Sequence, residues 1–547
     1  MLFRIDASTL PIRLAIFCGG KSNPGTDRHN NCKQWFPLSF STDVPIHIPN
    51  YKFDDAQLTA NSPLLYISVV TLGILTTSLF AGFHPALTIT YLRALGVPGA
   101  IGAFLLSSFL MHTLFTYQQH KRHADFPQPP RDSFFDGNWP TLKAAQSKNQ
   151  LFDKFGEWVD TYGQTILFWR QYSPKYFTAD PDIVRSMLTE ISIFTKFKFI
   201  PNRSLFGQRM TGTSSFLTVV GGSQWAIKRK VMSPYFSKIH LTTMFDKCHD
   251  YIKRGLELQF EEVEMNKTNV DIVEYYGELY QFFLGALGFD LDCELVSKNA
   301  KFHNAAIQGI LKWAPRQFGS IRDLLKMRVD KSVNNTICYL NKLRNISREI
   351  IAVKMEEYNT KGPQPDDIIH HVITANQLYD EPGVTNADLI IYMTDDIVTI
   401  FLVIDNMVKT LANMLVRVMR EPRVYKKMVE EIRDANLISL QSMDKSLRYT
   451  EMIILETLRL HPTLMRGIRY TENENTELNN GLVIKDKGMI FFGQLVLHRS
   501  TKYWKDPYEF QPERWENGSK DITPFTYLPF VAGPRVCMGK HLAIPTT

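Results

Sequence analysis

The sequence is poor in cysteine, and no two cysteines are spaced for a zinc ribbon or a thioredoxin-type redox motif. No CxxC motif occurs in its 547 residues. Sparse, unpaired cysteines are typical of a reducing compartment, where a thiol is a small buried apolar group or, rarely, a reactive or ligating one. A disulfide-stapled scaffold is therefore excluded. The six positions are Cys18, Cys32, Cys248, Cys293, Cys338 and Cys537.

The chain also lacks a basic block, an internal repeat and any low-complexity segment. Its 62 basic and 55 acidic residues leave a net charge of +7, a small excess for a chain of this length. We expect no nucleic acid partner from this balance, whereas an anionic membrane surface or an acidic protein suits it at least as well. Hydrophobic residues make up 44% and aromatic residues 12%, which is a globular composition with an apolar bias.

Long uncharged segments occur only near the amino terminus. Residues 56–92 contain no Asp, Glu, Lys or Arg and include an apolar run long enough to cross a bilayer as a helix. A second uncharged stretch, residues 94–120, precedes Lys121 and Arg122, whose charge favours the cytosolic side. We predict one or two transmembrane helices within residues 62–117. The second stretch is alternatively a buried or interfacial helix.

The rest of the chain divides into an extension, a hinge and a body. Residues 1–61 form an extension to which the sequence assigns no role. Residues 118–149 hold the proline-rich segment DFPQPPRDS, which cannot continue a helix and predicts an extended hinge at the domain entry. Residues 150–547 show mainly helical periodicity, with short strand-like runs such as 481–492. This pattern predicts one large, mainly α domain with small β-sheets.

The sharpest motif is PFVAGPRVCMG, which has the pattern FxxGxRxCxG. Five specified residues match by chance in about one chain in ten thousand of this length. A cysteine thiolate can ligate haem iron, and glycines on both sides allow a turn that brings the sulfur and backbone amides close to a porphyrin. The alternative is a buried cysteine in a Gly-Pro turn. The specified residues are Phe530, Gly533, Arg535, Cys537 and Gly539.

With this motif the chain resembles the cytochrome P450 family over about residues 125–544. ILETLRLHP places Glu456 and Arg459 three positions apart on one helix face, and YEFQPERWE supplies Arg514, similar to the ExxR helix and PERW segment of the family. The resemblance implies that the carboxylate and the two guanidiniums lock the core beneath the haem. Taken alone, Glu456 and Arg459 are a solvated helix pair.

The resemblance also implies the cofactor, haem b, with the Cys537 thiolate as the axial ligand of the iron. Phe530 is then expected to cover the thiolate and Arg535 to hold a haem propionate, while Gly533 and Gly539 shape the turn.

Further propionate contacts follow from the same resemblance. GSQWAIKRKVM carries Trp225 and Arg229 in the WxxxR arrangement of the family, and MRGIRY offers Arg469 as a third contact. As isolated residues, they are alternatively a core Trp, a surface Arg and an ordinary solvent-exposed Arg.

Two departures from the family bear on activity. Where the central helix of the family carries (A/G)GxDT(T/S), this chain has Val403, Asp405 and Asn406, so the Gly is replaced by Val and the Thr by Asn. We expect Asp405 and Asn406 to manage protons and Val403 to crowd the groove; the change indicates either altered chemistry or loss of function. Only ten residues follow Cys537, and Pro545 would break the helix after it early. We therefore expect a carboxy-terminally truncated cytochrome P450 fold, preceded by a membrane anchor.

We interpret the chain as a membrane-bound haem monooxygenase. It would take electrons from NADPH through NADPH-cytochrome P450 reductase, split dioxygen and insert one oxygen atom into an apolar small-molecule substrate. The sequence most resembles fungal membrane-bound hydroxylases of alkanes and fatty acids, and we expect it in membrane lipid of the endoplasmic reticulum with the catalytic domain on the cytosolic face. Two alternatives stay open: a haem-thiolate peroxide isomerase or peroxygenase, and an inactive truncated remnant.

Overall fold

The computed structural model contains two compact units, residues 1–109 and residues 110–547, which are described separately. The residues that the structure describes are 3–6, 13–16, 85–195, 223–243, 330–364, 367–378, 386–403, 405–435, 440–518, 520 and 522–546, with isolated positions between 253 and 277.

The first described elements are a short hairpin and a long helix. Strands β1 (Phe3–Asp6) and β2 (Arg13–Ile16) pair antiparallel. Helix α2 (Pro85–Arg122) contains the whole second uncharged stretch, residues 94–120, and its last turn carries basic side chains that suit the negative end of the helix dipole. The first predicted span lies outside the described residues as far as position 84.

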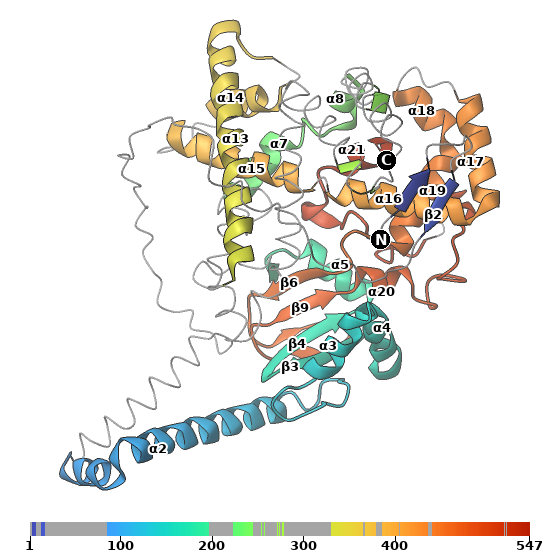
Figure 1. Cartoon of the computed structure of the whole chain (residues 1–547). Coiled ribbons are helices and arrows are strands. Elements are labelled where there is room, and N and C mark those ends of the chain that lie inside the picture. Colours follow the sequence, from blue (N-terminus) through green and yellow to red (C-terminus); the bar gives the residue numbers. More distant parts are fainter. Residues whose placement is uncertain are drawn as a thin grey trace. The chain divides into compact units, whose positions relative to one another are not determined.

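A five-stranded sheet forms one part of the second unit (Figure 1). Its strand order is β3 (Thr165–Arg170), β4 (Ser173–Thr178), β9 (Met489–Phe492), β6 (Gly467–Thr471) and β5 (Phe194–Thr195). The β4–β9 pair is parallel and the other pairs are antiparallel. Strands β7 (Thr476–Glu477) and β8 (Val483–Ile484) form a separate hairpin.

Two helices cover one face of this sheet. α3 (Trp139–Ser147) and α4 (Leu151–Tyr162) lie against β3 and β4 (Figure 1). Phe155 of α4 stacks on Phe177 of β4 with ring centroids 4.3 Å apart and an interplanar angle of 10°. Because strand side chains alternate between faces, this contact also fixes which residues of β4 face the helices.

The proline-rich segment at the domain entry forms neither helix nor strand at residues 127–131, and its backbone is bound to the sheet. The Leu167 N–H donates to the Pro127 carbonyl at 2.8 Å, and the Asn138 side chain donates to the Pro130 carbonyl at 2.7 Å. The Trp169 indole donates to Gln128 at 2.8 Å. These contacts hold the segment against β3, and a hinge role for it stays a prediction.

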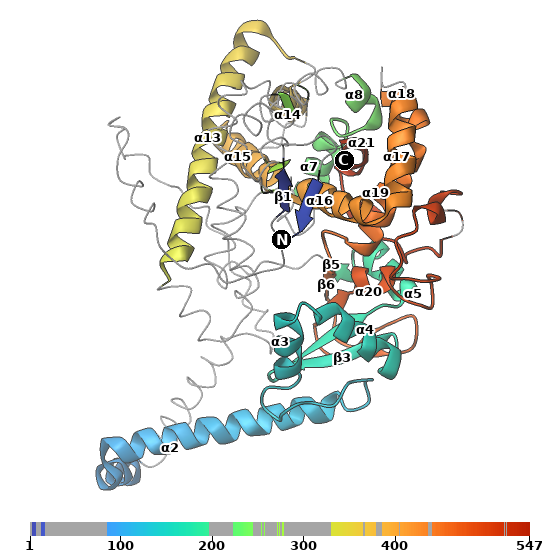
Figure 2. The same ribbon diagram turned by 45° about the vertical axis from the view of Figure 1, so that its right-hand side comes forward.

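The remaining described helices build the larger, helical part of the second unit. They are α5 (Pro181–Thr189), α7 (Ser223–Met232), α8 (Lys238–Thr243), α13 (Lys331–Lys361), α14 (Ile368–Leu378), α15 (Asn386–Val403), α16 (Asp405–Arg420), α17 (Pro422–Asp434), α18 (Leu440–Ser446), α19 (Arg448–Leu460), α20 (Gln494–His498) and α21 (Lys540–Thr546), with the 3-10 turns η3 (Pro512–Trp515) and η4 (Gly533–Arg535). Figure 2 shows α16 and α19 side by side with α17 next to them. The predicted mainly α fold with small sheets is confirmed.

The central helix is assigned in two parts, α15 and α16, and ends at Arg420, two residues before Pro422, as proline requires. Within the described residues, Met393–Arg420 is one segment that is long and apolar enough to cross a membrane, but half of its most apolar window is buried inside the protein. This segment packs on α13 and α19 and is therefore a core helix.

Candidate functional site

The cysteine motif forms a closed loop after the last β-strand. The Cys537 N–H donates to the Phe530 carbonyl at 3.0 Å, and the Val536 N–H donates to the Gly533 carbonyl at 3.0 Å within η4. Phe530 packs against the core cluster that includes Leu458 of α19. The loop is thereby anchored at its first residue and presents Cys537 with an exposed side chain.

Two positions of this loop have left-handed backbone conformations. Gly533 has φ +72°, and a Cβ placed there would lie 2.2 Å from the Leu188 carbonyl oxygen of α5. Glycine is therefore required, both for conformation and for space. Val531 has φ +59°, which is unfavourable for a β-branched residue. The loop consequently holds strain that its surroundings must balance.

The pKa of the Cys537 thiol is subject to opposing effects. Although the side chain reaches solvent, the surrounding protein partly desolvates the thiol and raises its pKa. A hydrogen bond from the Gly539 N–H and the charge of Arg229 act in the opposite direction and favour the thiolate. A backbone amide on the sulfur is the kind of contact that tunes a metal-bound thiolate.

Three arginines from separate elements converge beside this loop. The Arg535 guanidinium lies 4.0 Å from the ring centroid of Trp225 in α7. Burial and the nearby charges of Arg469 and Arg229 lower the pKa of Arg535 to about 10. Arg229, also on α7, donates to the Val536 carbonyl at 2.7 Å across 307 positions of sequence. The structure thus brings together all four residues predicted to bind propionates.

Arg469 enters this cluster from strand β6. Its side chain is buried, and this burial lowers its pKa to about 10; it donates to the Ile468 carbonyl at 2.9 Å. Among the described residues, neither Arg469 nor Arg229 forms an ion pair with a carboxylate. Desolvated guanidiniums without an acidic partner suit a bound group that carries carboxylates of its own. The donor set therefore fits a haem with two propionates and a thiolate ligand.

Glu456 is the centre of a buried network at the end of α19. Glu456 and Arg459 are fully buried, and the two carboxylate oxygens accept from Arg459 at 2.8 and 2.9 Å. Arg514 of η3 donates to the same carboxylate at 3.1 Å, as does the Trp515 indole. The structure therefore brings the predicted triad together, and Trp515, the last residue of the PERW segment, is a fourth member that the predicted triad did not include.

The far side of Arg459 binds backbone carbonyls. Its guanidinium donates to the carbonyls of His498 at 2.8 Å, Pro507 at 2.7 Å and Glu509 at 3.1 Å. Arg459 thus joins α19 to α20 and to the segment before η3, which is a role that lysine could not reproduce because only a guanidinium offers this planar set of donors.

The predicted proton-managing residues lie at the start of α16. Asp405 forms an ion pair with Lys409 one turn further along the helix. Within the described part of the chain, the Asn406 side chain makes no hydrogen bond, and Val403, the last residue of α15, is partly exposed. Val403 ends α15, and Asp405 and Asn406 begin α16. Within the described residues, no hydrogen bond connects their side chains to the cysteine loop.

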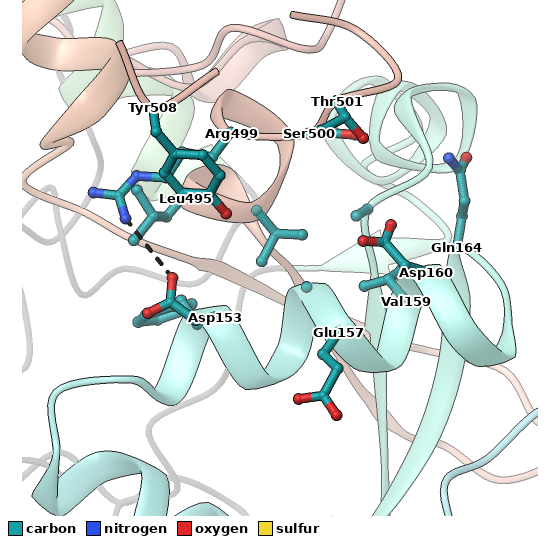
Figure 3. Close-up of a pocket in the computed structure, with 14 residues that line it drawn as sticks. Asp153, Glu157, Val159, Asp160, Gln164, Leu495, Arg499, Ser500, Thr501 and Tyr508 are labelled. Atoms are coloured by element: carbon teal, nitrogen blue, oxygen red, sulfur yellow. Dashed lines mark ion pairs between the residues drawn. The ribbon is translucent and has the colours of Figure 1, made fainter. Parts of the chain in front are cut away.

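One described pocket lies elsewhere, between α4 and α20 (Figure 3). Asp153, Glu157 and Asp160 extend from α4, and Arg499 and Tyr508 lie opposite them. An ion pair of 3.8 Å joins Arg499 to Asp153. No residue of the cysteine loop or of the arginine cluster lines this pocket, so it is separate from the candidate site.

A cluster that resembles a metal site, Glu357, Asp367 and His370, is filled by a lysine. Lys354 lies 2.9 Å from Glu357 and 3.1 Å from Asp367 and supplies the positive charge. Both ring nitrogens of His370 are engaged by backbone groups, the Gln364 N–H and the Lys354 carbonyl. This cluster is therefore an internal ion pair network.

Comparison with known proteins agrees with this site. The fold and the site define a haem-thiolate class of oxidoreductase, and the family model for Cytochrome P450 matches residues 127–546. The chain belongs to the cytochrome P450 family, and it is accordingly a monooxygenase with a haem-thiolate cofactor, a small-molecule substrate, dioxygen and a redox partner.

Similar proteins include three animal enzymes. Cytochrome P450 3A5 of Homo sapiens is 24% identical over 408 residues, which cover 72% of this chain and 77% of the relative. Cytochrome P450 3A41 of Mus musculus is 24% identical over 401 residues, 71% and 77% of the two chains. Cytochrome P450 3A40 of Oryzias latipes is 24% identical over 462 residues, 80% and 86%. These relatives give no support to a fungal hydroxylase type, which stays a prediction.

Proposed function

We propose that the chain is a membrane-bound monooxygenase that inserts one atom of dioxygen into an apolar substrate, with electrons from NADPH delivered by a reductase. The observation that carries this proposal is the convergence of Arg229, Arg469 and Arg535 beside the loop of Cys537. The charge of Arg229 acts directly on this thiol.

The residues of this chain would have separate roles at the site. Bound haem b would supply the redox chemistry and the activation of dioxygen. Cys537 would ligate its iron, with the Gly539 amide on the sulfur, and the arginine cluster with Trp225 would hold the propionates. Asp405 and Asn406 would move protons, Asp405 through its contact with Lys409.

An apolar substrate such as an alkane or a fatty acid fits the apolar character of the chain. Support comes from Val403, which replaces a small residue with an apolar one and stays partly exposed at the end of α15. A long acyl chain would gain about 0.8 kcal/mol for each methylene that it buries against apolar side chains.

We further propose anchorage in the endoplasmic reticulum membrane, with the catalytic domain of residues 150–547 on the cytosolic side. Support comes from α2, whose carboxy-terminal half exposes large apolar side chains and ends in a basic turn. The exposed residues are Leu105, Leu106, Phe109, Leu110, Met111, Leu114 and Tyr117. Expression with a tag on either end, followed by protease protection in microsomes, tests this topology.

The deciding experiment is the carbon monoxide difference spectrum of the reduced protein in membranes. A red-shifted Soret band, lost in Cys537→Ser and kept in the matched surface variant Cys338→Ser, is the expected result. An intact protein without this band would overturn the proposal and favour an inactive remnant. NADPH-dependent hydroxylation of a fatty acid with added reductase then tests the substrate class.

A second candidate, peroxide isomerisation or peroxygenase chemistry, is favoured by Asn406. This position lacks the hydroxyl group that donates and accepts through one rotating atom, and its amide has no described partner. Turnover of a fatty-acid hydroperoxide without reductase would support this candidate, and the variant Asn406→Thr would then shift activity towards the NADPH-dependent reaction.

A further inference from the structure

The inner face of the short helix α20 carries two polar residues that are fully buried. Gln494 and His498 both have no exposed surface. The Leu528 N–H donates to His498 Nε2 at 2.8 Å, and Gln494 Nε2 donates to the Leu528 carbonyl at 2.5 Å. Both main-chain groups of Leu528, the residue directly before the cysteine motif, are thus held by side chains of one helix.

The hydrogen bonds also determine the state of His498. Because Nε2 accepts from the Leu528 N–H, the ring proton lies on Nδ1, which donates to the Arg459 carbonyl at 3.2 Å. Arg459 donates in return to the His498 carbonyl at 2.8 Å. Burial, together with the charges of Arg459 and of Arg499 just after α20, lowers the pKa of His498 to about 3 and keeps the imidazole neutral. The ring of Tyr527 packs beside it, with ring centroids 5.2 Å apart.

The conformation of the cysteine loop depends on the position of Leu528. The Leu528 carbonyl also accepts from the Val531 N–H at 3.1 Å, which closes a turn in which Val531 adopts its unfavourable φ of +59°. Strain of this kind persists only where surrounding contacts over-determine the backbone. Phe530 lies within this turn of residues 528–531, and its carbonyl accepts from the Cys537 N–H.

We propose that Gln494 and His498 are positioning residues for the Cys537 ligand. They act through the main chain of Leu528 and hold the strained turn that sets the place of Phe530 and hence of the Cys537 sulfur. This inference rests on the proposed role of Cys537. Apolar residues at these two positions could fill the same volume, but they would leave the buried Leu528 N–H without a partner and its carbonyl with the Val531 N–H alone.

The test uses two substitutions at one position in the full-length protein. His498→Leu keeps a buried apolar bulk and removes the acceptor, whereas His498→Asn keeps an oxygen that can accept and an N–H that can donate. Amide hydrogen exchange of the haem-free protein is followed in the peptide that covers residues 526–537. We expect about tenfold faster exchange there in His498→Leu, and near wild-type exchange in His498→Asn.

The spectrum of the haem-loaded protein gives a second readout. In His498→Leu, the carbon monoxide complex should shift from the thiolate type towards the type of a displaced or protonated thiol, and His498→Asn should restore the thiolate band. Val531→Gly in the His498→Leu background should restore part of the thiolate band, because it removes the backbone strain that Gln494 and His498 balance.

The chain offers a matched control in His370. This residue is also fully buried, and its ring also accepts from one backbone N–H, that of Gln364 at 3.0 Å, while it donates to one carbonyl, that of Lys354 at 2.7 Å. We expect His370→Leu to speed exchange around α13 and α14 and to leave the peptide 526–537 and the spectrum unchanged.

Two results would overturn the inference. One is equal loosening of the peptide 526–537 in His498→Leu and His370→Leu, which would indicate general loss of stability. The other is wild-type exchange in His498→Leu. If the wild-type protein shows no thiolate band, the proposed function fails instead, and the exchange experiment on the haem-free protein still decides whether α20 holds the loop.

Discussion

At the scale of single residues, the cysteine loop depends on two left-handed positions that differ in kind. Gly533 lacks a side chain and packs directly on the Leu188 carbonyl, so its conformation is unstrained. Val531 carries a β-branched side chain in a region that such residues avoid. A side chain added at position 533 should therefore lower the stability of the protein, whereas removal of the side chain at position 531 should raise it.

Gly533→Ala should be strongly destabilising, by about 3 kcal/mol, because the new Cβ would lie 2.2 Å from a carbonyl oxygen in addition to its unfavourable φ. Gly518→Ala is the matched control, since Gly518 also has a positive φ, +67°, but open space around it; we expect a loss of about 1 kcal/mol. Urea unfolding of the two variants measures the difference. Equal losses would show that the contact with α5 has no energetic effect.

Val531→Gly should stabilise the protein by about 1 kcal/mol, since glycine adopts φ +59° without steric cost. The control Val536→Gly, at an ordinary φ of −53° in the same loop, should be destabilising because it only adds freedom to the unfolded chain. The midpoint of urea unfolding distinguishes them. A loss of stability in Val531→Gly would mean that its side-chain packing outweighs its backbone strain.

At the scale of elements, buried polar contacts join α19, α20 and η3 into one unit beneath the site. Arg459 contacts backbone in two other segments, and Glu456 binds Arg514. On the surface of the same unit, Glu513 of η3 accepts from Lys427 of α17 at 3.0 Å. The buried and the surface ion pairs have similar distances, and their burial decides their energetic importance.

Glu456→Gln should cost about 3–5 kcal/mol, because it leaves the fully buried guanidinium of Arg459 and the largely buried one of Arg514 with an incomplete partner. The surface pair between Lys426 and Glu430 on α17, 3.8 Å long and exposed, provides the control: Glu430→Gln should change stability by less than about 0.5 kcal/mol. Chemical denaturation of both variants measures the two losses of stability. Similar small effects in both would show that the Glu456 network contributes no net stability.

At the scale of the whole molecule, buried neutral histidines should make stability depend on pH. Burial lowers the pKa of His461 to about 4 and that of His498 to about 3. In the unfolded chain these groups bind protons below about pH 6.5, whereas the folded protein does not, so unfolding takes up protons. Stability is therefore complete above pH 6.5 and falls as the pH decreases towards 4.

This acid sensitivity is measurable as the slope of the unfolding free energy between pH 6.5 and pH 4.5. Each such histidine should contribute on the order of 1.4 kcal/mol per pH unit once its unfolded form is protonated. His461→Asn should make the slope shallower by one such contribution. An unchanged slope in that variant would show that His461 titrates normally in the folded protein.

Sequence motifs predicted site residues that the structure brings together where the signal is local. Cys537, its glycines and the pair Glu456 and Arg459 lie within short segments whose spacing reflects one turn or one helix face. The mainly helical body was also predictable, since apolar periodicity depends only on neighbouring residues. His498 and Gln494 were missed because their partners are main-chain groups, which leave no signature in side-chain patterns.

The sequence alone therefore determined the family and the mainly helical class of fold, and it predicted Cys537 as the ligand, because these depend on residue type and short-range spacing. Arg229, Arg469 and Arg535 come from α7, β6 and η4, so only the tertiary structure brings them to the one place that the family resemblance predicted for them. It likewise decided that Lys354 occupies the centre of a cluster that otherwise resembles a metal site. Contacts between distant segments are fixed by packing of the whole core, which no local pattern encodes.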